Sequence, residues 1–167
     1  MKFEILTGQH VGQLLEFERD NRAYFEKFIA PRPSHFFSEE GVSAHIASLV
    51  SLYHKGCALP VLVIDGGSVI GRVNLRDINL ENKQAEIGYR VAQSTAGKGI
   101  ATAAVRWMCE EAAINRGLSV VSARVLTNNP ASKAILAKCG FVFDSHIADF
   151  TEHRGQSLGC DIFRKHL

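Results

Sequence analysis

A glycine-rich turn at the start of a long helical pattern is the feature that most constrains this chain. The turn, residues 96–101 (AGKGIA), follows a strand-like run over Ala85–Val91 and precedes apolar residues that recur every three or four positions. Small residues at Gly97 and Gly99 let the backbone at a helix start approach a ligand closely, with unpaired amides pointing outward. Because the helix dipole adds positive potential there, we predict a phosphate or pyrophosphate site with Lys98 at its rim.

Two common phosphate-binding loops fail on spacing. A P-loop would put Ala92 at its first glycine and Gly99 in place of the magnesium-binding hydroxyl. A dinucleotide fingerprint would end in Thr102, and no carboxylate lies between Ala112 and Ser122, where the ribose partner is expected. The remaining candidate is the pyrophosphate loop of an acyl-CoA transferase.

The other predicted elements imply one mixed sheet covered by helices. The expected strands are residues 2–7, 59–64, 68–76, 85–91, 120–127, 141–150 and 158–164, and the expected helices are 11–28, 39–53, 101–112 and 129–139. Ser38 is the expected N-cap of the second helix. The order predicts an α/β (α+β) fold whose first three strands after the second helix are antiparallel neighbours.

Length and composition favour a single ordinary domain over residues 1–167. The formal net charge of +2 gives no argument for a nucleic-acid surface. The amino terminus lacks the apolar core of a secretory signal, and no run is long enough to span a bilayer, so we expect a cytoplasmic protein without membrane attachment. The cysteines are scattered without metal-ligand spacing, so no metal site is expected.

Three blocks of this sequence resemble the GNAT acyltransferases. The loop is similar to their Gln/Arg-x-x-Gly-x-Gly/Ala signature, with Gly99 and Ala101 at its small positions and Ala96 departing from its first. The preceding strand reads AEIGY over 85–89, and a later helix begins NPAS at 129–132 and is followed by Gly140-Phe141. The amino-terminal residues 18–25 look like the RimJ/RimL branch, the ribosomal-protein N-terminal acetyltransferases.

The resemblance implies a GNAT fold, a mixed and mostly antiparallel sheet flanked by helices. In this fold the strands at 85–91 and 120–127 splay apart to hold acetyl-CoA. It implies pyrophosphate binding by the backbone of Gly97, Lys98, Gly99, Ile100 and Ala101. It also implies contacts to the pantetheine arm and thioester from the exposed backbone of Val91 and Ala92. Asn129, by its match, would hydrogen-bond the same arm.

Two residues are candidates for the proton transfers of an acetyltransferase. Glu86 could accept the proton of an attacking amine, directly or through water, although a carboxylate on a strand also commonly pairs with a neighbouring cation. Many GNAT proteins use a tyrosine in the last helix as the acid, and this chain has Leu136 there. The RimJ/RimL resemblance suggests Ser132 instead.

The expected reaction is acetyl transfer from acetyl-CoA to a primary amine by direct attack. The RimJ/RimL resemblance favours the α-amine of a protein such as a ribosomal protein as the acceptor. Small amines, including polyamines and antibiotics, stay open, as do a noncatalytic acyl-CoA-binding module and a homodimer.

Overall fold

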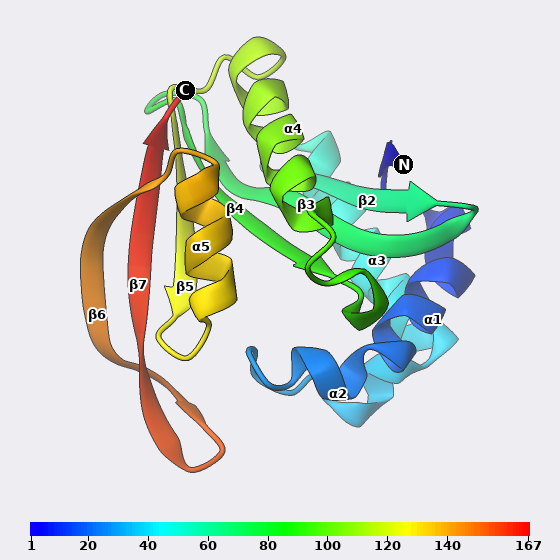
Figure 1. The fold of residues 1–167 in the computed structure, drawn as a ribbon. Helices are drawn as coiled ribbons and strands as arrows, with labels where there is room; N and C mark the ends of the chain where they lie inside the picture. The colour runs from blue at the N-terminus through cyan, green and yellow to red at the C-terminus, as the bar shows by residue number, and fades with distance from the viewer.

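A computed structural model describes residues 1–167 as one seven-stranded sheet flanked by helices (Figure 1). The strands are β1 (Lys2–Ile5), β2 (Leu59–Asp65), β3 (Ser68–Asn79), β4 (Gln84–Val91), β5 (Val120–Leu126), β6 (Val142–His153) and β7 (Gln156–His166). The main helices are α1 (Val11–Asp20), α2 (Arg22–Phe25), α3 (Glu39–His54), α4 (Ile100–Ile114) and α5 (Pro130–Lys138). The strand order is β1-β2-β3-β4-β5-β7-β6, and every pairing is antiparallel except β4–β5. The expected mixed, mostly antiparallel fold is therefore confirmed.

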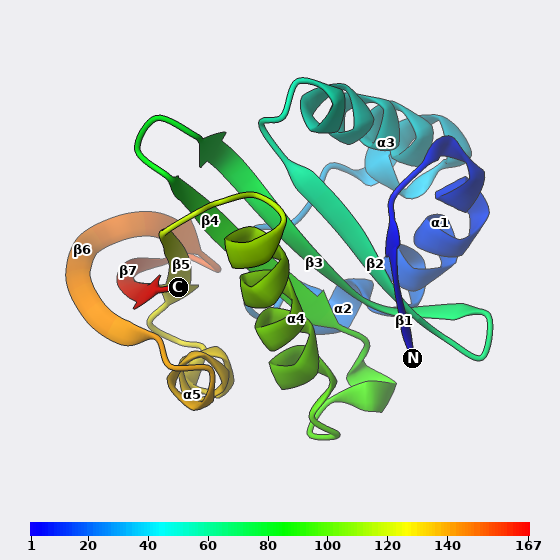
Figure 2. The same ribbon diagram turned by 90° about the horizontal axis from the view of Figure 1, so that it is seen from above.

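The helices lie on both faces of the sheet (Figure 2). One apolar core, which includes Val61, Ile87 and Met108, packs α4 and α5 against one face. A second core, which includes Leu14 and Ile46, packs α1 and α3 against the other face. Alternation along the strands supplies both cores, because successive side chains of a strand point to opposite faces.

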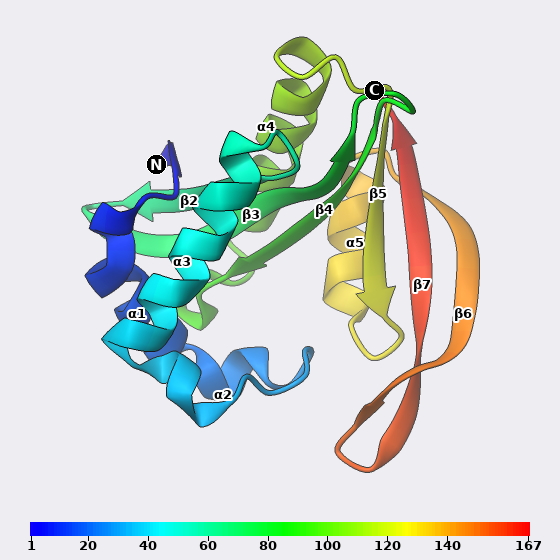
Figure 3. The same ribbon diagram turned by 180° about the vertical axis from the view of Figure 1, so that it is seen from behind.

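The sheet divides between β4 and β5. Their parallel pairing covers only Gln84–Ile87 against Val120–Ala123, although both strands continue beyond it. Seen from behind, the two strands diverge from their shared end into a V (Figure 3). The predicted splay is thus present, and it exposes the backbone edge of the second half of β4.

Local signals located most elements well. Ser38 caps α3 as expected, with its hydroxyl accepting from the amide of Gly41 at 3.0 Å. The predicted helix over 11–28 is instead broken at Asn21, and the final hairpin is longer than predicted, with β6 reaching His153 and β7 starting at Gln156. No helix in the structure has both the length and the apolar character needed to cross a membrane.

The break at Asn21 has a clear cause. Its side-chain amide donates to the carbonyl of Phe17 at 2.9 Å, and its side-chain oxygen accepts from the amide of Gln93 at 2.8 Å. An asparagine that bonds the backbone in this way competes with helix propagation. Asn21 therefore ends α1 and ties it to the segment that leaves β4.

Candidate active site

The start of α4 presents a group of unpaired backbone amides. Gly97 and Gly99 have φ of 76° and 79°, a conformation that L side chains rarely adopt. This turn leaves five amides without an acceptor in the chain, those of Gly97, Gly99, Ile100, Ala101 and Thr102. Lys98 is exposed beside them. Such a cradle at the positive end of a 15-residue helix has the donors that a phosphate group needs, and the phosphate site stays a prediction.

The open edge of β4 leads away from this cradle. The amide of Ala92 donates to the carbonyl of Ile70 at 2.8 Å, and its carbonyl accepts from the amide of Thr95 at 3.0 Å. Because successive strand amides point to opposite edges, the amide of Val91 faces the side that β5 has left. Of the two backbone groups predicted to meet a thioester, Val91 has a free amide, whereas the backbone of Ala92 is already engaged.

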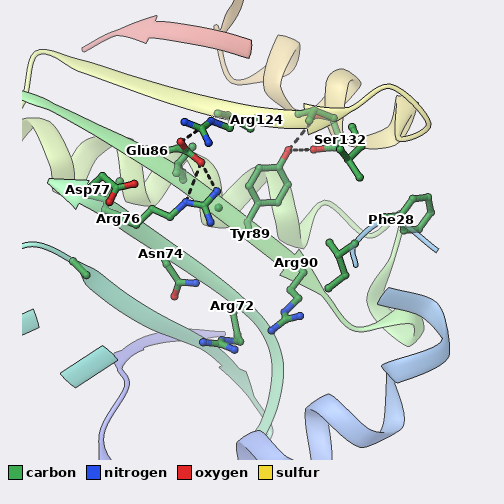
Figure 4. Close-up of a pocket in the computed structure, with 18 of the residues that line it drawn as sticks. Phe28, Arg72, Asn74, Arg76, Asp77, Glu86, Tyr89, Arg90, Arg124 and Ser132 are labelled. Carbon is green, nitrogen blue, oxygen red and sulfur yellow. Dashed lines mark hydrogen bonds and ion pairs between the residues drawn. The ribbon is translucent and has the colours of Figure 1, made fainter. Parts of the chain in front are cut away.

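A cleft of about 780 Å³ lies at the split. Its walls come from β3, β4, β5, α3, the start of α5, the segment 28–32 and the turn region of β6. Figure 4 shows its polar side chains, most of which project from the adjacent strands β3 and β4, with Arg124 on β5 and Ser132 on α5. Gly88 lies among them, and a Cβ added there would have no heavy atom within 4 Å, so the missing side chain keeps this part of the cleft open.

Asn129 and Ser132 meet the cleft at the start of α5. The side-chain oxygen of Asn129 accepts from the amide of Ser132 at 3.1 Å and caps the helix, which leaves its NH2 group without a partner in the chain. The Tyr89 hydroxyl lies 2.7 Å from the Ser132 hydroxyl and 3.1 Å from the Ser132 carbonyl, and its single proton can be donated to only one of these two oxygens at a time. Burial raises the pKa of Tyr89 to about 12, so its phenol stays protonated at neutral pH.

Glu86 is buried in the cleft wall between two guanidinium groups. Oε1 accepts from Arg76, its cross-strand neighbour on β3, and Oε2 lies 3.1 Å from Nε of Arg124 on β5 (Figure 4). The cross-strand cation considered from the sequence is therefore Arg76, whereas Arg90 pairs with Glu18. Both oxygens of Glu86 already have guanidinium partners.

A second charged cluster was not predicted. Arg72 and Arg90 face each other across β3 and β4, and both bond Oε1 of Glu18, at 2.8 and 2.5 Å. Nη2 of Arg72 also lies 3.3 Å from Nε2 of His45. The available sequence signal was the alternation Arg72, Asn74, Arg76 on one face of a long strand, which marks that face as polar.

No group of three or more His, Cys, Asp or Glu side chains is arranged to hold a metal ion. The structural features instead suit a long ligand with an anionic end and an amide-bearing arm. The amides at the start of α4 supply donors for the anion, and the free edge of β4 supplies donors for the arm.

Comparisons with known proteins agree on one family. The chain is 24% identical over 144 residues to the ribosomal-protein-serine acetyltransferase of Escherichia coli (strain K12), covering 86% of this chain and 80% of that protein. It is 31% identical over 134 residues to the probable N-acetyltransferase YjcK of Bacillus subtilis (strain 168), covering 76% and 72%. Among solved structures, RimL, a ribosomal L7/L12 α-N-protein acetyltransferase in complex with coenzyme A, superposes with a TM-score of 0.92 at 19% identity, covering 99% of this chain and 93% of that one.

A family profile covers most of the chain. It is described as an acetyltransferase (GNAT) domain and matches residues 4–142, a span that runs from β1 to the first residue of β6. This protein belongs to the GNAT family of acetyl-CoA-dependent N-acetyltransferases.

Proposed function

We propose that this enzyme acetylates the α-amine of a protein amino terminus, such as that of a ribosomal protein. The observation that carries the proposal is the split between β4 and β5, which joins a phosphate cradle to a cleft large enough for a peptide end. The acceptor class is supported by the similarity to the E. coli ribosomal-protein-serine acetyltransferase and to RimL.

In this proposal acetyl-CoA supplies an activated acetyl group, and the chain binds and orients it. The free amides of Gly97, Gly99, Ile100 and Ala101 hold the pyrophosphate. The amide of Lys98 is already bonded to the carbonyl of Thr95, so Lys98 contributes the charge of its side chain at the rim. The NH2 group of Asn129 bonds the arm. The amide of Val91 polarises the thioester carbonyl, a role that grows as negative charge develops on the oxygen.

Glu86 is assigned to the removal of the amine proton and Ser132 to the stabilisation of the leaving thiolate. The amine attacks the thioester carbon directly, so no acyl-enzyme forms. Glu86 takes the amine proton through a water in the cleft. The Ser132 hydroxyl keeps its proton and donates a hydrogen bond that stabilises the departing thiolate, which then takes a proton from water. A thiolate with a pKa near 8.5 is already a fair leaving group, so this donation contributes only part of the rate enhancement.

The charge state of the amine favours an amino terminus over a lysine. An α-amine with a pKa near 7.8 is about one-seventh neutral at pH 7, whereas a lysine near 10.4 is neutral in only about one molecule in 2,500. The difference corresponds to roughly 3.5 kcal/mol of deprotonation free energy. A weak base that acts through water does not supply enough free energy to make a lysine react as readily as an α-amine.

A matched pair of peptides tests the acceptor. One peptide has a free amino terminus and no lysine, and the other has a blocked terminus and one lysine. We expect kcat/KM near pH 7 to favour the free terminus by at least tenfold. Equal rates, or a preference for lysine, would reject the proposal. Failure of both peptides together with rapid acetylation of a polyamine or an aminoglycoside would assign the enzyme to small amines instead.

A further inference from the structure

The cluster beneath the cleft carries more positive charge than its own carboxylate can balance. Glu18 is the carboxylate bonded to both Arg72 and Arg90, and its Oε1 serves both guanidinium groups. Arg32 also lines the cleft, with its guanidinium carbon 4.2 Å from the ring centre of Phe36. Like charges directly opposite on neighbouring strands are destabilising unless a counter-charge joins them.

His45, which lies beside Arg72, adds neither a positive nor a negative charge to the cluster. Burial, together with the nearby Arg72, Arg32 and Arg90, lowers the pKa of His45 to about 3, so the ring is neutral at physiological pH. The carboxylates that line the cleft are Asp77 and Glu86. Glu86 is occupied by Arg76 and Arg124, and Asp77 is an exposed residue at the far end of the same strand face. The Arg72 end of the cleft therefore keeps a net positive charge.

Unused hydrogen-bond donors lie at this end of the cleft. The side chain of Arg72 is only 3% exposed, yet its Nε has no partner. Nε of Arg32 is likewise buried without a partner. Both residues line the cleft, and a buried donor without an acceptor carries a desolvation cost that a bound acceptor would remove. In Figure 4 Arg72 and Arg90 extend toward each other on the side of the cleft away from Ser132.

From this geometry we infer that the acceptor carries an anionic group close to its reacting amine, which Arg32, Arg72 and Arg90 bind. The inference deepens the proposed function and rests on it. Guanidinium groups suit carboxylate or phosphate oxygens, which accept more than one of their donors at once. The arginine cluster acts in acceptor recognition, because it is separate from the groups assigned to acetyl-CoA.

The strand spacing gives the position of the anion along the acceptor. Arg90 directly precedes Val91, whose amide is assigned to the thioester carbonyl, so the arginine cluster lies close to the position where the amine attacks. A strand rises about 3.3 Å per residue, so the first few residues of an extended acceptor pass this cluster. We therefore expect the anionic side chain at the second or third residue of the acceptor.

A peptide series tests the inference. Lysine-free peptides with amidated carboxyl ends begin with serine and have aspartate, asparagine or phosphoserine at the second and third positions. We expect the aspartate peptide to exceed the asparagine peptide in kcat/KM by about tenfold to a hundredfold, mainly through KM, since charge-assisted hydrogen bonds are involved. The phosphoserine peptide distinguishes a preference for phosphate from one for carboxylate.

Arg32→Gln and Arg116→Gln form a matched pair of variants. Arg32 is half-buried in a loop and outside the Glu18 ion pairs, so its loss leaves those pairs in place. Arg116 lies past the far end of α4, and its substitution removes the same charge. Arg32→Gln should reduce the preference for aspartate to below threefold, whereas Arg116→Gln should keep it. Thermal unfolding of both variants checks that each is folded.

The outcomes separate the two proposals. Equal rates for the aspartate and asparagine peptides in the wild-type enzyme overturn the inference, while the reaction of both still supports amino-terminal acetylation. If no peptide reacts, the proposed function fails, and aspartate α-amide is compared with asparagine α-amide as small amines. Equal rates for that pair also overturn the inference. If Arg116→Gln removes the preference for aspartate as fully as Arg32→Gln does, the preference depends on the overall charge of the protein. That result would contradict an anion site at the arginine cluster.

Discussion

The hydroxyl groups of Ser132 and Tyr89 form a short pair at the start of α5. When Tyr89 donates its single proton to the Ser132 hydroxyl oxygen and not to the Ser132 carbonyl, the serine proton is free to point into the cleft. The pKa of about 12 keeps the tyrosine proton in place throughout the neutral range. In the proposed reaction Ser132 is the group that contacts the leaving thiolate, and Tyr89 is a positioning residue that orients its hydroxyl.

Substitution of either residue tests this arrangement. Ser132→Ala should lower kcat by about tenfold to a thousandfold, because it removes the hydrogen bond that stabilises the departing thiolate. Tyr89→Phe should lower kcat less and leave the serine in place. The affinity for acetyl-CoA, measured by calorimetry, should change little in both variants. An unchanged kcat in Ser132→Ala would show that Ser132 has only a structural role in the first turn of α5.

Glu86 is tested through the pH dependence of the reaction. Glu86→Gln should lower kcat/KM at pH 6.5 by at least tenfold, and the deficit should narrow above pH 8. The sign follows from the amine, which is mostly protonated below its pKa of about 7.8 and needs a base there, but is mostly neutral above it. The measurement is a profile of kcat/KM against pH with a lysine-free peptide.

Arg124→Gln is the control for Glu86. It breaks the same ion pair but leaves the carboxylate, so its pH profile should keep the wild-type shape. If both variants show the same constant deficit across the pH range, Glu86 serves only to hold the strands together.

At the level of elements, the two ends of α4 offer a matched comparison. Gly99 precedes the helix and Gly117 follows it, both have positive φ, and an added Cβ meets nothing within 4 Å at either site. Gly99→Val and Gly117→Val should each lower the free energy of unfolding by about 1–2 kcal/mol from the left-handed conformation. Only Gly99→Val should abolish acetyl-CoA binding, because its side chain and the shifted turn disturb the free amides at the start of α4. Gly117→Val should leave acetyl-CoA binding unchanged.

The measurements are thermal unfolding and calorimetric titration with acetyl-CoA. A folded Gly99→Val protein that binds acetyl-CoA as tightly as Gly117→Val does would remove the start of α4 from the binding site.

Elements with a local cause were predictable from the sequence. The Ser38 cap and the glycine-rich start of α4 each depend on residues within a few positions. The break at Asn21 was missed because one of the two bonds that hold its side chain is to Gln93, which is 72 positions away. A helical pattern in the sequence cannot show that an asparagine side chain will accept a hydrogen bond from a distant backbone amide.

At the scale of the whole molecule, the acetyl-CoA half of the site has local causes in the sequence, whereas the arginine cluster depends on contacts between distant residues. The loop and the β4 edge follow from contiguous motifs, and the family resemblance located them. The cluster of Glu18, Arg72 and Arg90 exists only because α1 packs against β3 and β4, which brings residues 54 and 72 positions apart into contact. Alternation along β3 marked a polar face, but nothing in the sequence paired it with a carboxylate on a helix.

The divided sheet also bears on self-association. An unpaired strand edge at the margin of a sheet invites other chains to add a strand, which leads to aggregation. Here the edges of β4 and β5 face each other inside the molecule, joined at one end by their short pairing and bordered by α5. The fold therefore shields the unpaired backbone groups of β4 and β5 from other protein chains. A narrow ligand that enters from the open end of the V can still form hydrogen bonds with them, whereas the same groups on an outer edge would promote aggregation.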